Sequence, residues 1–194
     1  MSSWEYGPYS LDSDQMLNNA KLVQQWGWSF GWSDNAICAI LGNMQEESTI
    51  NPGIYGDNGN AYGLVQWNPY TKYSLWAGAG WKNNGNKEME RINYEANHEE
   101  QWFYNDQLGL YPYCTFSEFV HDSTTPIETL ADWFCWFYEH PTNPIQPVRA
   151  TNARYWYNTL EWEQPPEPPD PPDPPEPEPF PYWILFKFKG RGLH

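Results

Sequence analysis

The segment from Ser33 to Met44 constrains the fold most strongly, because its apolar residues repeat with the period of an α-helix. Ser33 is a favourable N-cap residue, and Asp34 places a negative charge in the first turn. The pattern predicts an amphipathic helix whose apolar residues form one stripe that faces the core. The stripe consists of Ala36, Ile37, Ile40, Leu41 and Met44.

Two adjacent carboxylates follow this stripe and point to different sides of the helix. At about 100° per residue, Glu47 lies about 20° from Ala36, inside the apolar face, whereas Glu46 lies about 80° outside it. A carboxylate that ends an apolar face is poorly solvated when charged, so its pKa rises and it can hold a proton near neutral pH. Glu47 is therefore a candidate general acid. The alternative is that it caps the helix or forms an ion pair at the helix end.

A turn-rich segment and a short β-prone run follow Glu47. The run is Tyr62-Gly63-Leu64-Val65-Gln66-Trp67. A helix, a buried glutamate, a polar turn and a short strand with Gly and Gln form the layout of the lysozyme superfamily. More narrowly, ICAILGNMQEESTINPG followed by YGLVQWNPY resembles the phage tail lysozyme family. A weaker resemblance continues through FYEHPTNPIQPVRATNARYWYNTL to about Leu160.

This resemblance implies a function. Members of the family degrade cell walls and are carried on the tail tips of short-tailed phages of Gram-positive bacteria. It implies a glycosidase that cuts the MurNAc-GlcNAc β-1,4 bond of the peptidoglycan glycan strand, by hydrolysis as a lysozyme or by lytic transglycosylation. It also implies that Glu47 is the catalytic acid, in agreement with the helical period. The alternative is a catalytically silent, glycan-binding or structural tail component of the same fold.

The resemblance further implies that the segment from Tyr62 to Trp67 lines the sugar-binding groove. The residue types fit this role. Gln66 offers both a hydrogen-bond donor and an acceptor, which suits an N-acetyl group or a hydroxyl. The flat face of Trp67 can stack on a sugar ring, and Gly63 allows a ligand to approach the backbone closely. The predicted substrate-binding residues are Tyr62, Gly63, Gln66 and Trp67.

A glycosidase usually needs a second carboxylate. Asp57 lies in the turn-rich segment, where lysozyme-type enzymes often place their second acid, although Asp57-Asn58-Gly59 also reads as a simple turn. Some lysozyme relatives use a single glutamate, together with the acetamido group of the substrate or a positioned water. Glu139 is a third possibility, which we interpret as a structural residue paired with an arginine such as Arg149.

The rest of the chain predicts an α+β, mainly α, lysozyme-like fold with a small β element. A capping box at Thr125 and Glu128, with Pro126 at the first helical position, starts one of the later helices. Cys38 is expected on the outer side of its helix. The predicted helices cover residues 13–27, 33–47, 70–79, 86–103, 116–121, 126–140 and 148–160.

The composition argues against several classes of protein. The net charge of −15 argues against nucleic acid as a partner, because nucleic-acid binding depends on Lys and Arg that neutralise phosphates. Three scattered cysteines and four histidines without ligand spacing predict no disulfide framework, no metal site and no cofactor. We find no run that could cross a bilayer and no signal peptide. We therefore expect synthesis in the host cytoplasm and a final location in the virion, at the tail tip.

The C-terminal part has a different composition and divides the chain into three regions. Residues 1–162 form the lysozyme-like domain, 163–181 a linker and 182–194 an anchor peptide. The linker is rich in Pro and acidic residues, which predicts polyproline II, and Pro165–Pro181 would span roughly 50 Å. The apolar and basic peptide that follows is expected to bind a phage tail protein by adding a strand to its sheet. Contact with a membrane surface is the competing interpretation.

Overall fold

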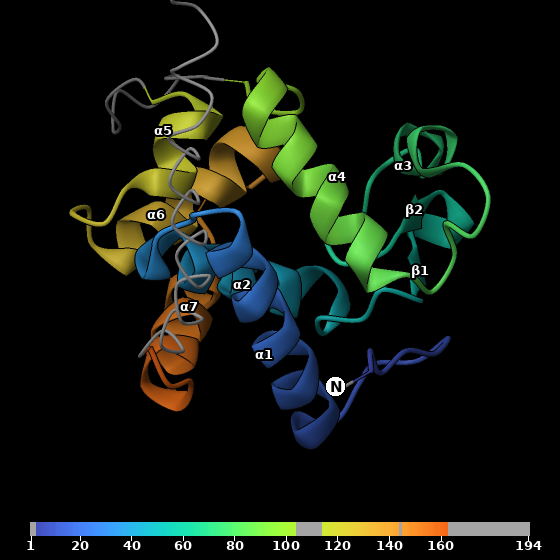
Figure 1. The fold of residues 1–194 in the computed structure, drawn as a ribbon, viewed down its shortest axis with the longest axis horizontal. Helices are drawn as coiled ribbons and strands as arrows, with labels where there is room; N and C mark the ends of the chain where they lie inside the picture. The colour runs from blue at the N-terminus through green and yellow to red at the C-terminus, as the bar shows by residue number, and fades with distance from the viewer. Residues whose placement is uncertain (1–2, 104–113, 144, 163–194) are drawn as a thin grey trace, which may run out of the picture. The chain divides into compact units, whose positions relative to one another are not determined.

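The computed structural model describes residues 3–103, 114–143 and 145–162, and this part of the chain has the expected α+β, mainly α, lysozyme-like fold (Figure 1). Within it lie seven α-helices and one two-stranded sheet. The predicted linker 163–181 and the predicted anchor 182–194 fall outside the described residues. The elements are α1 (Ser13–Ser29), α2 (Asp34–Ser48), β1 (Tyr55–Gly56), β2 (Ala61–Tyr62), α3 (Thr71–Ala77), α4 (Gly85–His98), α5 (Phe116–His121), α6 (Ile127–Phe134) and α7 (Pro147–Thr159).

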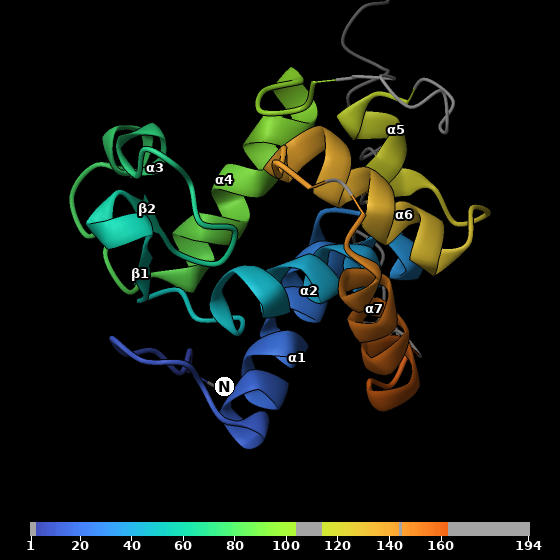
Figure 2. The same cartoon turned by 180° about the vertical axis from the view of Figure 1, so that it is seen from behind.

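Helix α2 is the centre of the core, and α1, α6 and α7 pack around it (Figure 2). Ser33 caps it as predicted, because its hydroxyl accepts a hydrogen bond from the Ala36 N–H at 3.1 Å. The apolar stripe is fully buried. Cys38 is also buried, so the prediction that it lies on an outer side was wrong. The physical reason is that neighbouring helices cover α2 on more than one face.

Helices α2 and α7 approach each other closely at Gly42. A Cβ at this position would lie 2.6 Å from the backbone nitrogen of Ala153, which real Cβ atoms do not tolerate. The close approach brings Arg149, one turn earlier in α7, beside the C-terminal half of α2. There its Nη1 donates a hydrogen bond to Oδ1 of Asn43 at 3.0 Å. The glycine in α2 therefore decides where the side chain of Arg149 lies.

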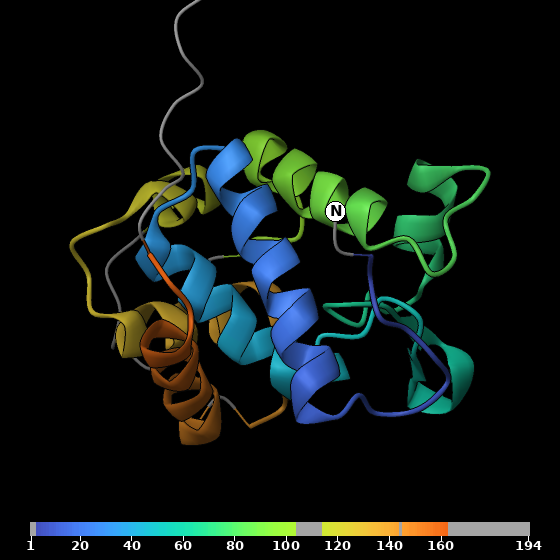
Figure 3. The same ribbon diagram turned by 60° about the horizontal axis from the view of Figure 1, so that its bottom comes forward.

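Helix α4 links two groups of elements: the sheet and α3 lie on one side of it, and α5 and α6 lie on the other (Figures 1 and 2). It contacts α3 and α5 directly, and it also contacts α1 (Figure 3). The helix begins at Gly85, and its N-cap is Asn84, two residues before the predicted cap Asn86. The side chain of Asn86 instead accepts hydrogen bonds from the indoles of Trp4 and Trp26.

The β element is shorter than the predicted run from Tyr62 to Trp67. The strands pair Tyr55 with Tyr62 and Gly56 with Ala61, antiparallel. At Gly63 the backbone turns, with φ of +82°, and Trp67 comes back to bridge with Tyr62. The β-prone residues therefore form a compact loop after β2, because the glycine permits a turn that the residue pattern alone did not reveal.

The start of α6 also differs from the prediction. Pro126 occupies the cap position, and no side chain caps the helix, so the expected capping box of Thr125 and Glu128 is absent. Glu128 instead pairs with Arg154 of α7, with 2.6 Å between Oε1 and Nε. A tertiary ion pair has replaced the local hydrogen bond. A π-helix (Cys135–Glu139) then continues α6.

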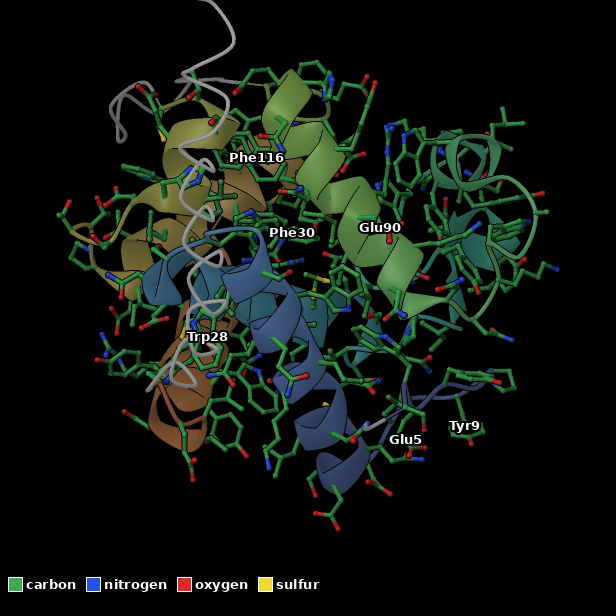
Figure 4. All side chains as sticks on the ribbon, in the orientation of Figure 1. Glu5, Tyr9, Trp28, Phe30, Glu90 and Phe116 are labelled. Carbon is green, nitrogen blue, oxygen red and sulfur yellow. The ribbon has the colours of Figure 1, made fainter. Side chains whose placement is uncertain are left out.

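The N-terminal arm, residues 3–12, is tied to the domain by side-chain amides. Asn19 donates a hydrogen bond to the carbonyl of Glu5 at 2.8 Å, and Asn51 donates one to the carbonyl of Tyr9 at 2.7 Å. Figure 4 shows Glu5 and Tyr9 on this arm, and Trp28 and Phe30 near the C-terminal end of α1. None of the helices in the described part of the chain combines the length and hydropathy that a membrane span requires.

Candidate active site

The two carboxylates at the end of α2 lie in different environments, as the helical period predicts. Glu46 is exposed and accepts a hydrogen bond from Asn152 at 2.7 Å. The side chain of Glu47 is 20% exposed, and its Oε1 lies 2.5 Å from Nη2 of Arg149, which is itself 7% exposed. The structure therefore contains the ion pair that the sequence left open as an alternative role for Glu47.

Glu47 lines a cavity of about 410 Å³ at the junction of α2, the β element and the end of the π-helix. A second cavity of about 320 Å³ adjoins it, because both are lined by Gln66, Asn68 and Glu139. The remaining lining residues of the first cavity are Gly56, Asp57, Ala61 and Pro141. The combined volume suits part of a sugar chain rather than a single small ion.

Two more of the predicted site residues line the cavity of Glu47. Asp57 is exposed at the turn between the strands, and its Oδ2 accepts a hydrogen bond from Nδ2 of Asn68 at 2.8 Å. The amide of Gln66 donates to the carbonyl of Gly63 at 2.8 Å. The structure thus brings Glu47, Asp57 and Gln66 to one cavity, although they come from three separate local segments.

The other predicted residues take different places. Trp67 lines the second cavity, but its side chain is almost fully buried and its indole N–H donates to Oε1 of Glu95 at 3.1 Å. Tyr62 lines neither of these cavities; it is buried, and its hydroxyl accepts a hydrogen bond from the Asn83 N–H at 2.7 Å. Burial raises the pKa of this hydroxyl well above its ordinary range.

The backbone at Gly63 lies close to the buried carboxylate of Glu88 in α4. A Cβ on Gly63 would lie 2.5 Å from Oε2 of Glu88. That oxygen accepts a hydrogen bond from the Leu64 N–H at 2.7 Å, and burial holds the pKa of Glu88 well above its usual range. The hydrogen bond from Leu64 to Glu88 therefore holds the turn after β2 against α4. This contact fixes the position of Gln66, three residues after Gly63.

A second buried carboxylate of α4 connects this loop to the π-helix. Glu95 accepts hydrogen bonds from Trp67 at 3.1 Å, from Arg91 at 2.9 Å and from the hydroxyl of Tyr138 at 2.5 Å. Burial raises the pKa of Glu95, while these donors and the charge of Arg91 act in the opposite direction. Because Tyr138 precedes Glu139, the network holds both sides of the second cavity together.

Glu139 is the site residue whose environment the sequence analysis did not foresee. It lines both cavities, and its Oε1 is buried without a hydrogen-bond partner in the described residues. Burial, then the neighbouring charge of Glu47, raises its pKa well above the usual range, with Arg149 acting in the opposite direction. Its predicted pairing with Arg149 was wrong, because the hydrogen bonds of that guanidinium go to three other residues. Those residues are Asn43, Glu47 and Gln146.

One local signal for Glu139 was available: it ends a helix two residues before a proline, in the sequence FYEHP. What the sequence could not show is that α6 continues as a π-helix, a form that occurs frequently at functional sites. Within residues 3–103, 114–143 and 145–162, no group of three or more His, Cys, Asp or Glu side chains could hold a metal ion.

The fold and this cavity define a lysozyme-like protein, and a comparison with known families agrees. The family model of the phage tail lysozymes matches residues 18–160, so the chain belongs to the phage tail lysozyme family. It is also 42% identical over 157 residues to Morphogenesis protein 1 of Bacillus phage B103. That match covers 77% of this chain and 41% of the relative, so the chain spans about two fifths of the relative's length. The chain is therefore a lysozyme-like protein associated with phage tails.

Proposed function

We propose that this protein cleaves the glycan strand of peptidoglycan at the MurNAc-GlcNAc β-1,4 bond, and that it does so as part of a phage tail that breaches the host cell wall. Membership of the phage tail lysozyme family supports the general class. The bond and the activity are our inference.

The observation that carries the proposal is that both carboxylates and side-chain amides line one cavity. Glu47 and Glu139 line it together with the side chains of Gln66 and Asn68. Glycoside cleavage needs one group that gives a proton to the leaving oxygen and another that acts at the anomeric carbon. Side-chain amides can bind the acetamido groups and hydroxyls of amino sugars. The cavity thus combines the groups for the reaction with groups for this substrate.

Glu47 is the central catalytic residue in this proposal. The resemblance assigns it the role of general acid, and its position at the end of a buried helix face supports a part in the chemistry. Asp57 lines the same cavity and stays a candidate for stabilising positive charge that develops on the sugar. Either water or the C6 hydroxyl of the MurNAc residue can add to the anomeric carbon, which distinguishes a lysozyme from a lytic transglycosylase.

One observation favours the alternative of a catalytically silent glycan-binding or structural tail component. The ion pair of Glu47 with Arg149 is what a structural carboxylate would form, and it occupies Oε1. A silent component would bind glycan strands in the same cavity but would release no fragments.

The test uses the full chain on purified Gram-positive peptidoglycan, with mass spectrometry of the released muropeptides. The wild type should release disaccharide-containing fragments, and Glu47→Gln should lower the rate by about 10²–10⁴-fold, the usual contribution of a proton-transfer group. Glu46→Gln is the matched control, because this neighbour is exposed and should matter little. Binding by the wild type without release would favour the silent component, and equal loss in both variants would contradict the role of Glu47.

The same fragments identify the chemistry. Reducing MurNAc ends indicate hydrolysis, whereas anhydro-MurNAc ends indicate transglycosylation.

For the tail location, we propose that residues 182–194 bind another tail protein. The acidic chain, with a net charge of −15, gains no long-range attraction to an anionic cell wall, so delivery on a particle replaces electrostatic steering.

A further inference from the structure

The cavity of about 320 Å³ that adjoins the cavity of Glu47 differs from it in charge. The described residues that line the cavity of Glu47 include three acids and no Lys, Arg or His, whereas Lys72 and His140 line the adjoining cavity. Burial and then the neighbouring charge of Lys72 lower the pKa of His140. Lys72 therefore supplies the positive charge of the adjoining cavity, in a chain whose net charge is −15.

The charge of Lys72 is not used within the described part of the chain. Lys72 is exposed in the first turn of α3, and its Nζ donates a hydrogen bond to Oε1 of Gln101 at 3.1 Å. This acceptor is a neutral amide, and the ion pairs among the described residues do not involve Lys72. An ammonium group has three N–H donors, so two remain for a carboxylate of a ligand.

An aromatic ring stands at the edge of the same cavity. Phe103 is 59% exposed, and its ring centroid lies 5.3 Å from that of His140. The Phe103 N–H donates to the carbonyl of Phe137 at 2.9 Å, and Nε2 of Gln101 donates to the carbonyl of Tyr138 at 3.2 Å. These bonds hold the Phe103 segment against the π-helix, so its ring offers an apolar surface to a ligand beside Lys72.

The wall between the two cavities contains an unused polar atom. Gln66, Asn68 and Glu139 line both cavities, so a ligand that extends from one cavity to the other contacts these side chains. Oε1 of Glu139 is buried without a hydrogen-bond partner in the described residues, although buried polar atoms are nearly always paired. A peptide group has a donor and an acceptor side by side, so it would satisfy this carboxyl group whether or not it carries a proton.

We propose that the adjoining cavity binds the peptide stem of peptidoglycan, with Lys72 paired to a stem carboxylate, and that strands bearing stems are therefore the preferred substrate. The inference rests on the proposed function. The stem branches from the lactyl group of MurNAc, so it leaves the strand directly beside the sugar that occupies the cavity of Glu47.

The chemistry of the stem matches the lining of this cavity better than a further sugar does. The amino sugars of the strand carry no charge, so a sugar in this cavity would leave Lys72 without an ionic partner. The stem supplies carboxylates for Lys72, an alanine methyl group for the ring of Phe103 and peptide groups for Glu139. The two adjoining cavities thus suit a branched ligand, with the strand in one and the branch in the other.

The experiment compares three forms of one soluble glycan, prepared from Gram-positive walls freed of teichoic acid and of peptide cross-links. The first form keeps its peptide stems, the second has their carboxylates converted to methylamides, and the third has lost the stems to an amidase. Gel filtration follows the shortening of the strands at low substrate concentration. It gives kcat/KM whether the bond breaks by hydrolysis or by transglycosylation.

The wild type should cleave the first form about threefold to tenfold faster than the second, the effect of one partly exposed ion pair. The third form should be the slowest, because it also lacks the apolar and peptide contacts. Lys72→Met should cleave the first and second forms at equal rates, and Lys72→Arg should keep the preference. Lys21→Met is the matched control, because Lys21 is exposed on α1 and lines neither cavity.

Each ratio compares two substrates of one protein, so a partial loss of folding in a variant does not change it. A wild type that cleaves the first form no faster than the second or the third would overturn the inference while leaving the glycosidase proposal intact. A preference for the first form over the second that persists in Lys72→Met would do the same. A wild type that cleaves none of the three forms would overturn the proposed function, and this inference with it.

Discussion

Nη2 of Arg149 lies 2.5 Å from Oε1 of Glu47 and joins two helices that are about a hundred residues apart in the chain. Arg149 is almost fully buried and also donates a hydrogen bond to Asn43, so its position is determined by α2 rather than by solvent. The ion pair fixes the orientation of Glu47 at the cavity, and it leaves Glu139 as the carboxylate of the cavity whose pKa is raised. Burial is the largest cause of this rise, and the neighbouring charge of Glu47 adds to it.

The stability of the protein should depend on pH through Glu139. Because its pKa in the folded protein is raised above the unfolded value of about 4.3, the folded state holds a proton that the unfolded state has lost between these two values. The stabilising contribution of this group is therefore complete below the unfolded pKa and is lost as the pH rises through the folded pKa. The free energy of unfolding of the wild type, minus that of Glu139→Gln, should fall as the pH rises above about 4.

Denaturant unfolding of both proteins at a series of pH values measures this difference. Glu88, Glu95 and Asp132 also have raised pKa values, but they are present in both proteins, so their contributions cancel. A difference that does not change with pH would contradict the prediction.

Substitution of Gly63 should destabilise the protein more than substitution of another glycine with a similar backbone. Gly59→Ala, with φ of +91° and nothing near its Cβ position, should cost about 1–3 kcal/mol through backbone strain alone. Gly63→Ala, with φ of +82°, should cost about 1–3 kcal/mol more, because Glu88 must move and lose its bond to the Leu64 N–H. Denaturant unfolding compares the two variants, and equal losses would show that the contact with Glu88 is unimportant.

Asp57→Asn should lower the turnover on peptidoglycan partially, by less than Glu47→Gln. Asn keeps an oxygen that can accept the hydrogen bond from Asn68, so the substitution removes the charge and little else. A charge near the reacting sugar assists the transition state without being essential to it. Steady-state release of muropeptides measures the effect, with the exposed Asp14→Asn in α1 as the control. Unchanged turnover would remove Asp57 from the mechanism.

Deletion of residues 182–194 should leave the domain soluble and active on isolated walls but should remove the protein from phage particles. The peptide Tyr182–Lys189 is apolar and short, so it gains stability mainly by burial in another protein. Comparison of the protein content of particles made with the full and the truncated chain measures incorporation. A chain that carries a Gly/Ser segment of equal length in place of residues 182–194 is the control for length. Full incorporation of the truncated chain would place the attachment in the globular domain and would favour a membrane-surface role for the peptide.

The elements that depend on local order were predictable from the residues. The helix period separated Glu46 from Glu47, and the structure confirms that one is exposed and the other faces the cavity. Ser33 caps α2 as expected, and the turn signals around Asp57 mark a real turn, although it lies between the two strands and not between the helix and the β element. Each of these features depends on neighbours within a few residues, where the backbone geometry limits the choices.

The features that the sequence did not reveal depend on contacts between distant segments. Cys38 is buried because several helices surround α2, and Glu128 binds Arg154 across the domain instead of capping its own helix. Likewise, Tyr62 lies among other aromatic rings and not at the cavity, because the rings of Tyr73 and Trp81 pack against it. A periodic pattern identifies the buried face of one helix but not the helices that cover it.

The sequence by itself determined the helix of Glu47, the lysozyme-like arrangement of segments and the residue types available for chemistry at the cavity. Only the tertiary structure decided which carboxylate receives the positive charge. Arg149 could have paired with Glu47 or with Glu139, and the close packing of α7 against Gly42 directs its guanidinium to Glu47. Charge and burial act over a few ångströms in space, so the pKa of Glu139 depends on distances that no spacing along the chain contains.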